Sequence, residues 1–211
     1  MNAREILWGS HLILVTDPRP DLAARVAAGI RGGVDIVQLR DKHTPMQDLL
    51  QLAGELKEAC DSEGALFTVN DDATLARLSG ASCVHLGQED GLLSDAREAL
   101  GPDAVIGRSV GATDEALEAI RDGADYLGAG AIYGTPTKPE GEVAGLTLIR
   151  DLARAELPVP WFAIGGTTLE TAGGVAAAGA PGFAVVRAVL DAEDPEAAAR
   201  ELRSHLPDAP A

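Results

Sequence analysis

The sequence predicts a single-domain α/β protein, a small (β/α)8 TIM barrel spanning residues 1–211. Short apolar runs alternate with amphipathic helical patterns from end to end of the chain. The apolar runs are nearly continuous, which is typical of parallel strands that are covered on both faces. Several helical patterns end in glycine directly before an apolar run, as at Gly33, Gly123 and Gly179. A helix that ends at glycine and leads into a buried strand is a repeating β/α signal.

The elements follow one another in regular order. Strands are expected at residues 11–17, 36–41, 66–71, 83–87, 104–110, 125–132, 161–166 and 182–190. Helices are expected at residues 21–33, 45–64, 72–78, 92–100, 113–123, 146–157, 168–179 and 195–206, because their apolar residues recur every three or four positions. Residues 207–211 are expected to be a frayed tail. An open doubly wound sheet is the alternative, but it needs fewer strands, and no G-x-G-x-x-G follows the first strand.

Composition narrows the functional class. The chain has 211 residues, 46% of them apolar, which suffices for one domain with a sizeable core. Its formal net charge of −16 argues against nucleic acid and against anionic membranes as partners. No apolar stretch reaches the roughly 18 residues that a membrane span needs, and the first residues do not resemble a leader, so a cytoplasmic location is expected. Cys60 and Cys83 are interpreted as buried thiols in a reducing compartment.

Polar residues gather where the predicted strands end, which is where a barrel of this kind carries its chemistry. The second strand ends in Gln38, Arg40 and Lys42, and a spacing of two places these side chains on one face. Basic residues are scarce in this acidic chain, so clustered ones carry more meaning. The simpler alternative is a solvated strand end with an ordinary salt bridge.

Acidic and amide residues follow the third and fourth strands. Asp72 is interpreted as a helix N-cap, which leaves Asn70 and Asp71 for the mouth of the barrel. Asp90 follows the adjacent strand, and two carboxylates at neighbouring strand ends can hold one Mg²⁺. Spacing alone makes this a weak indication in a chain rich in acids. His85 is interpreted as a packed or hydrogen-bonded core residue. The Ser109 hydroxyl can form a hydrogen bond either to a phosphate group or to the backbone of a turn.

Two loops have the composition of phosphate-binding turns. In the first, which follows the strand at 125–132, the residues that suit an anion are Thr135, Pro136, Thr137 and Lys138. The threonines offer hydroxyl and amide donors, and the lysine adds a positive charge. The second loop, Ile164-Gly-Gly-Thr-Thr168, follows the next strand. Two such loops in succession indicate an enzyme whose substrate carries phosphate groups.

Together these motifs resemble those of the thiamine-phosphate synthase (thiamine-phosphate pyrophosphorylase) family. The resemblance covers most of the chain and is specific because the motifs stand in order at successive strands. They are Val37-Gln-Leu-Arg-Asp-Lys42, Val69-Asn-Asp71, Val84-His-Leu-Gly-Gln-Glu-Asp90, Ile106-Gly-Arg-Ser109, Gly128 to Lys138, Ala163-Ile-Gly-Gly166 and Val185-Val-Arg-Ala188. It implies a transferase that joins an aminopyrimidine methyl pyrophosphate to a thiazole phosphate, giving thiamine phosphate and pyrophosphate.

The resemblance also implies roles for individual residues. The pyrimidine pyrophosphate would be bound by Gln38, Leu39, Arg40, Asp41, Lys42, Asn70, Ser109 and Lys138. The thiazole phosphate would be bound by Thr135, Pro136, Thr137, Gly166, Val186 and Arg187. Asp71 and Asp90 would hold Mg²⁺, and Arg40, Lys42 and Lys138 would stabilise the departing pyrophosphate. Arg187 stands where a small residue is usual in the family, Ala131 where a proline is usual, and Gly111 where a histidine is common.

Three other functions compete with the synthase. A thiazole tautomerase on the same fold would need neither pyrophosphate nor metal, so Arg40, Lys42 and the two aspartates argue against it. A sugar-phosphate epimerase or isomerase would need an acid/base pair, which Asp71 and Asp90 can supply, but it gives the Gln-x-Arg-x-Lys motif no role. A silent binder of thiamine intermediates would bind ligand without turnover. The sequence leaves open whether copies of the chain form a homo-oligomer.

Overall fold

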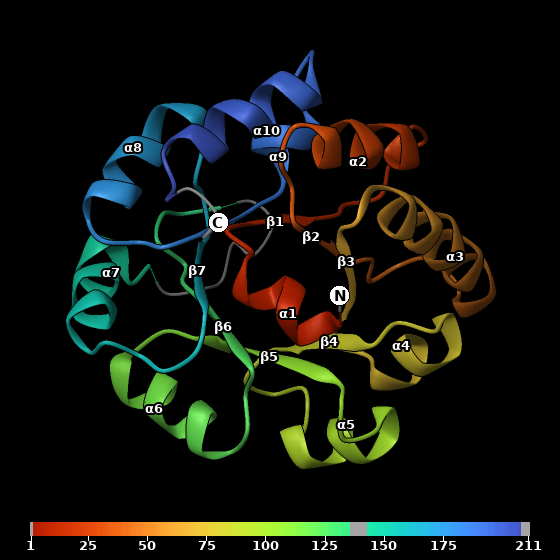
Figure 1. Cartoon of the computed structure of the whole chain (residues 1–211), viewed down its shortest axis with the longest axis horizontal. Coiled ribbons are helices and arrows are strands. Elements are labelled where there is room, and N and C mark those ends of the chain that lie inside the picture. Colours follow the sequence, from red (N-terminus) through yellow and green to blue (C-terminus); the bar gives the residue numbers. More distant parts are fainter. Residues whose placement is uncertain (1, 136–142, 208–211) are drawn as a thin grey trace.

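The structure is a computed structural model, and it describes residues 2–135 and 143–207. Within these residues, eight parallel strands close into a barrel in chain order, β1 to β8, as Figure 1 shows. The strands are β1 Leu12–Val15, β2 Ile36–Leu39, β3 Leu66–Asn70, β4 Cys83–Leu86, β5 Val105–Val110, β6 Tyr126–Ala129, β7 Trp161–Ile164 and β8 Phe183–Val185. The predicted TIM barrel is therefore confirmed.

The helices form a ring outside the strands (Figure 1). They are α2 Leu22–Arg31, α3 Met46–Glu63, α4 Ala73–Ser79, α5 Leu93–Leu100, α6 Thr113–Arg121, α7 Gly145–Arg154, α8 Leu169–Ala177 and α10 Pro195–Ser204, with the short α1 Ala3–Trp8 and α9 Arg187–Leu190 in addition. The predicted strand at 182–190 was wrong in its second half, because the chain turns into α9 two residues after β8 ends. None of the helices described is both long and apolar enough to cross a bilayer.

The larger core lies between the strands and the surrounding helices. Outward-facing strand residues such as Leu14, Val37 and Leu127 pack there against the apolar faces of the helices, including Val26 of α2. Cys60 lies in this layer, and both cysteines are buried free thiols, as expected. Because both faces of every strand are covered, the strands are mostly apolar, and their few polar residues, such as Gln38 and Asn70, lie toward the carboxyl ends.

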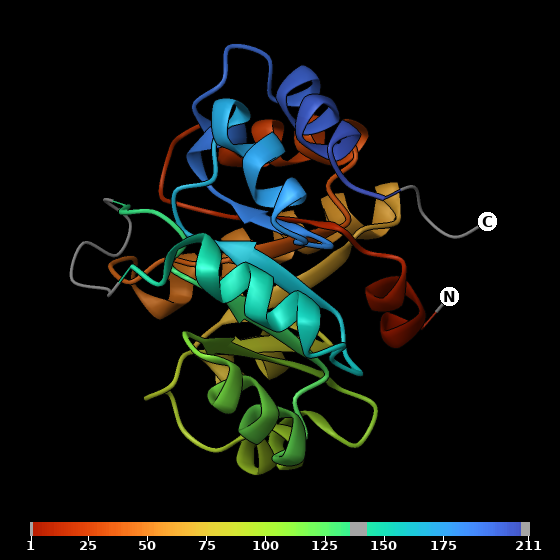
Figure 2. The same cartoon turned by 90° about the vertical axis from the view of Figure 1, so that its left-hand side faces the viewer.

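A second, smaller core fills the barrel interior. It contains Ile13, Val105, Tyr126 and Phe162, and α1 closes it from the N-terminal end of the strands with the side chain of Leu7, which is 1% exposed. Figures 1 and 2 show α1 lying across that end of the barrel. The carboxyl ends of the strands are left free to carry polar groups.

Candidate active site

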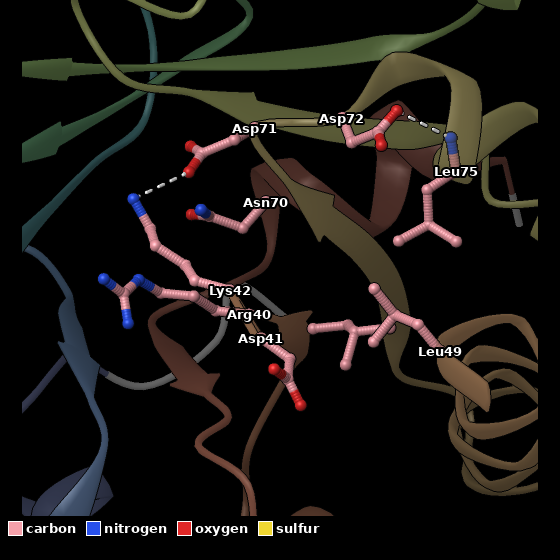
Figure 3. Close-up of a pocket in the computed structure, with 9 residues that line it drawn as sticks. Arg40, Asp41, Lys42, Leu49, Asn70, Asp71, Asp72 and Leu75 are labelled. Carbon is pink, nitrogen blue, oxygen red and sulfur yellow. Dashed lines mark hydrogen bonds and ion pairs between the residues drawn. The ribbon is translucent and has the colours of Figure 1, made fainter. Parts of the chain in front are cut away.

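Four polar side chains from two strand ends point into one space at the C-terminal mouth of the barrel. Figure 3 shows Arg40 and Lys42, which follow β2, beside Asn70, which ends β3, and Asp71, which follows it. They line a cavity of 270 Å³. The structure therefore brings together the cationic and amide residues that the sequence placed at neighbouring strand ends.

The backbone of the β2 end is fixed by its neighbour. The buried hydroxyl group of Thr16, which follows β1, accepts a hydrogen bond of 3.0 Å from the Arg40 amide. Gln38 of β2 faces the barrel interior and is 3% exposed. The polar face of β2 therefore extends from Arg40 into the barrel interior. The alternation predicted for Gln38, Arg40 and Lys42 is consistent with this placement.

Asp71 reaches the cavity through an unusual backbone conformation. Its φ angle is 65°, in the left-handed region that few residues other than glycine adopt, although aspartate tolerates it better than most. The Asp71 amide donates a 2.8 Å hydrogen bond to the His85 carbonyl, which holds the turn against β4. The Asp71 carboxylate then lies 3.5 Å from the ammonium group of Lys42 (Figure 3).

Asp71 and Asp90 form a pair of facing carboxyl groups. Burial, together with a hydrogen bond and charge repulsion from Asp90, raises the pKa of Asp71 to about 6. Hydrogen bonds from Asp71 and from the Gly87 amide outweigh partial burial and lower the pKa of Asp90. Two carboxyl groups that face each other can together hold a hard divalent cation, which prefers oxygen ligands.

The two carboxyl groups form a pair and not a larger cluster of acidic, histidine or cysteine side chains in the part of the chain that the structure describes. Among the described residues, no group of three or more histidine, cysteine or acidic side chains is arranged to hold a metal. A cation held by Asp71 and Asp90 would therefore take its remaining oxygens from water or from substrate phosphates, as Mg²⁺ commonly does.

Some side chains near the motif point elsewhere. Leu39 is buried in the outer core. The Asp41 carboxylate caps its own loop, where it accepts hydrogen bonds from the amides of His43 and Thr44. Asp72 caps α4 by accepting a 2.8 Å hydrogen bond from the Leu75 amide, which confirms its predicted role. Both residues line the cavity, but the Leu39 side chain packs in the outer core and the Asp41 carboxylate is engaged within the loop.

A buried polar layer lies beneath the mouth, and the sequence did not reveal its extent. Nε2 of His85 is 2.9 Å from the Ser109 hydroxyl, so Ser109 has a protein partner. Burial, followed by the positive charge of Arg108, lowers the pKa of His85 to about 4. His85 is therefore neutral at physiological pH and serves as a hydrogen-bonding core residue, as the sequence indicated.

Small residues make this layer possible. A Cβ atom on Gly107 would lie 2.4 Å from Nδ1 of His85, and one on Gly128 would lie 3.0 Å from its Cε1. Gly128 therefore makes room for a protein side chain rather than for a ligand. Two inward-facing glycines on β5 and β6, the strands that follow β4, were the sequence signal that could have located the imidazole.

The expected thiazole-phosphate residues come from β6, β7 and β8. The Arg187 guanidinium lies 3.5 Å from the Thr135 hydroxyl, so the loop after β6 and the start of α9 meet. Gly166 has a φ angle of 70°, and a Cβ atom there would lie 2.7 Å from that of Tyr133. Val186 links β8 to α9. Pro136, Thr137 and Lys138 lie outside the described residues.

Comparison with known proteins supports the resemblance. The family model for thiamine monophosphate synthase matches residues 12–189. The thiamine-phosphate synthase of Synechocystis sp. is 45% identical over 195 residues, which are 92% of this chain and 57% of that protein. The thiamine-phosphate synthase of Thermobifida fusca is 44% identical over an alignment of 207 positions, which covers 96% of this chain and 95% of that protein.

A solved structure shares both the fold and part of the sequence. Thiamine phosphate pyrophosphorylase from Pyrococcus furiosus superposes with a TM-score of 0.85 at 35% identity, and the match covers 97% of each chain. The chain thus spans slightly more than half the length of its cyanobacterial relative and nearly all of the other two. The family match, the ordered motifs and the shared barrel agree: the chain belongs to the thiamine monophosphate synthase family.

Proposed function

We propose that the chain is a thiamine-phosphate synthase that condenses 4-amino-2-methyl-5-hydroxymethylpyrimidine pyrophosphate with thiazole phosphate. The products are thiamine phosphate and pyrophosphate. The observation that carries this proposal is the convergence of Arg40, Lys42 and Asn70 with the Asp71–Asp90 pair at one side of the mouth. A departing pyrophosphate is stabilised by cationic side chains and a divalent cation that lie together around it. Family membership indicates the class of reaction.

In this proposal the reaction is a substitution at the pyrimidine methylene carbon. The C–O bond breaks, and its electron pair departs with the pyrophosphate. The resulting pyrimidine-stabilised cation is attacked by the thiazole nitrogen, whose lone pair forms the new C–N bond. No proton leaves in this sequence and no protein nucleophile is required.

The residues at the β2 and β3 ends would stabilise the leaving group. Arg40 and Lys42 would bind pyrophosphate oxygens as negative charge develops, joined by Lys138, and Asn70 would orient the group through its amide. Mg²⁺ held by Asp71 and Asp90 would neutralise part of the pyrophosphate charge. Lys42 now lies against Asp71, so it would exchange that carboxylate for the substrate.

The other half of the mouth would hold the second substrate. Thr135, Thr137, Gly166, Val186 and Arg187 would bind the phosphate of the thiazole and bring its nitrogen into line with the methylene carbon. Ser109, fixed by His85, would contact the pyrimidine half from below. The small molecules are the partners in this proposal, and a cytoplasmic location is proposed with it.

An omission experiment tests the proposal. Purified protein is given the pyrimidine pyrophosphate, the thiazole phosphate and Mg²⁺, and each component is omitted in turn while pyrophosphate release is measured. Release that requires all three, with thiamine phosphate as co-product, is expected. Saturable binding of thiazole phosphate without pyrophosphate release would contradict the synthase and favour the tautomerase or the silent binder.

A further inference from the structure

Arg108 lies on the outer face of β5, next to residues of the site but not among them. Its neighbours Gly107 and Ser109 both face the barrel interior, where they meet His85. Because side chains alternate along a strand, Arg108 emerges on the opposite face, toward the helices and loops. Neither the pyrophosphate half nor the thiazole half of the site uses it.

The guanidinium of Arg108 binds both ends of the turn that carries Asp90. Nη1 donates a 2.5 Å hydrogen bond to the Gly87 carbonyl, and Nη2 donates a 2.9 Å hydrogen bond to the Gly91 carbonyl. The turn has its own internal bonds, from the Gly87 amide to the Asp90 carboxylate at 2.8 Å and from the Asp90 amide to the Gly87 carbonyl at 3.2 Å. Arg108 thus ties both ends of this turn to β5.

The composition of the Gly87–Gly91 turn explains why anchoring by Arg108 is useful. A Cβ atom on Gly87 would lie 2.5 Å from the Asp90 carboxylate, and Gly91 has a φ angle of 99°, so both positions favour glycine. Two glycines leave the turn with much conformational freedom and with no side chains that could pack at its ends. The planar fork of arginine suits the task, because it can reach two acceptors at once in a fixed geometry.

We propose that Arg108 is a positioning residue for the divalent cation. It holds the Gly87–Gly91 turn so that the Asp90 carboxylate already faces Asp71 before the cation arrives. This inference rests on the proposed cation pair of the synthase and extends it to a residue outside the mouth. Groups that orient metal ligands commonly change metal affinity as much as tenfold to 100-fold when they are lost.

The experiment measures binding of Mn²⁺, as a probe for Mg²⁺, to the metal-free protein without substrates. Free Mn²⁺ is followed by electron paramagnetic resonance in wild type, Arg108→Gln, Arg108→Lys and Asp90→Asn. Arg97→Gln is the matched control, because Arg97 also bonds two backbone carbonyls, those of Ala104 and Gly123, at the other end of the barrel.

Arg108→Gln is expected to weaken Mn²⁺ binding about tenfold or more, and Arg108→Lys by less, since lysine keeps the charge but loses the fork. Arg97→Gln should lower the melting temperature and leave Mn²⁺ affinity within about twofold of wild type. Amide hydrogen exchange at residues 87–91 should speed up in Arg108→Gln. Arg108→Lys also guards against a failure of the glutamine variant to fold.

Wild-type Mn²⁺ affinity in both Arg108 variants would overturn the positioning role, even if the omission experiment establishes the synthase. An equal loss of affinity in Arg97→Gln would overturn it too, because general destabilisation would then explain the effect. Equal Mn²⁺ affinity in wild type and Asp90→Asn would contradict the proposal that Asp71 and Asp90 hold the cation. The positioning role of Arg108 would then be overturned as well.

Discussion

At the N-terminal end of the barrel interior, Leu7 of α1 covers an apolar layer that includes Ile13 and Phe162. At the C-terminal end, the same strands finish in side chains such as Arg40 and Asn70, which line an open cavity. One end is sealed and apolar, while the other carries buried polar groups and charges. The comparison indicates that stability depends mainly on the first end and chemistry on the second, so substitutions at the two ends should separate these properties.

The largest effect is expected at the polar end. Arg40→Ala should lower kcat by about 10²- to 10³-fold, because a preorganised charge aimed at the leaving group is lost. Steady-state kinetics with both substrates measures this, and a thermal melt should remain close to wild type. Lys57→Ala, which removes a surface cation of α3 paired with Asp61, is the control and should retain full activity. A fall in melting temperature as large as that of a core variant would break the proposed separation.

The sealed end should show the reverse behaviour. Leu7→Ala should lower the free energy of unfolding by about 2–5 kcal/mol, because a fully buried leucine leaves a cavity when it is truncated. Urea unfolding measures the loss. The KM values for both substrates should stay at wild-type levels under conditions in which the variant is folded. Altered KM values would show that truncation of Leu7 also changes the substrate-binding site.

His85 lies between the two ends and should link stability to pH. Its pKa is lowered to about 4 in the folded protein, whereas the unfolded chain takes up its proton near pH 6.5. The unfolded state therefore binds more protons between these values, and stability should fall as pH drops from about 6.5 toward 4 by up to roughly 3 kcal/mol. Urea unfolding at several pH values tests this.

The matched comparison for that experiment is His85→Gln, which keeps a hydrogen-bonding group but cannot titrate. The carboxyl groups titrate in both proteins, including Asp71, so only the difference between the two pH profiles reports the imidazole. Parallel profiles would mean that His85 does not carry a lowered pKa in the folded state.

The smallest effect is expected on the thiazole side. Arg187→Ser should raise the KM for thiazole phosphate by about tenfold and leave the KM for the pyrimidine pyrophosphate unchanged, because one exposed charged hydrogen bond is lost. Adding salt should raise the KM for thiazole phosphate more in the wild type than in the variant, because salt screens the charge of Arg187. An equal change in both KM values would place Arg187 outside the second-substrate half.

Much of this protein could be predicted from particular residues. Continuous apolar runs between helix-ending glycines determine a parallel barrel, because buried strands lose their alternation. The polar residues that follow those runs must gather at one end, since parallel strands finish together. The placement of Asn70 and Asp71 at the mouth and the Asp72 cap were predicted correctly in this way, because each depends on local order.

Other features escaped prediction because they depend on contacts between distant segments. Residues 182–190 are apolar apart from Arg187, a pattern that suits a strand as well as a buried helix, and only packing makes the second half α9. Nothing local predicts that α1 closes the barrel. The left-handed backbone of Asp71, which departs from strand alternation, is held by the His85 carbonyl of the next strand.

The sequence by itself determined the architecture, the end of the barrel at which polar residues gather and the residue types available there. Tertiary structure alone decided which of those side chains meet. It turned Asp41 away into its loop, paired Ser109 with His85, and placed Arg108 behind the turn of Asp90. The physical reason is range: hydrophobic periodicity and caps act within a few residues, whereas hydrogen bonds across strands depend on closure of the whole barrel.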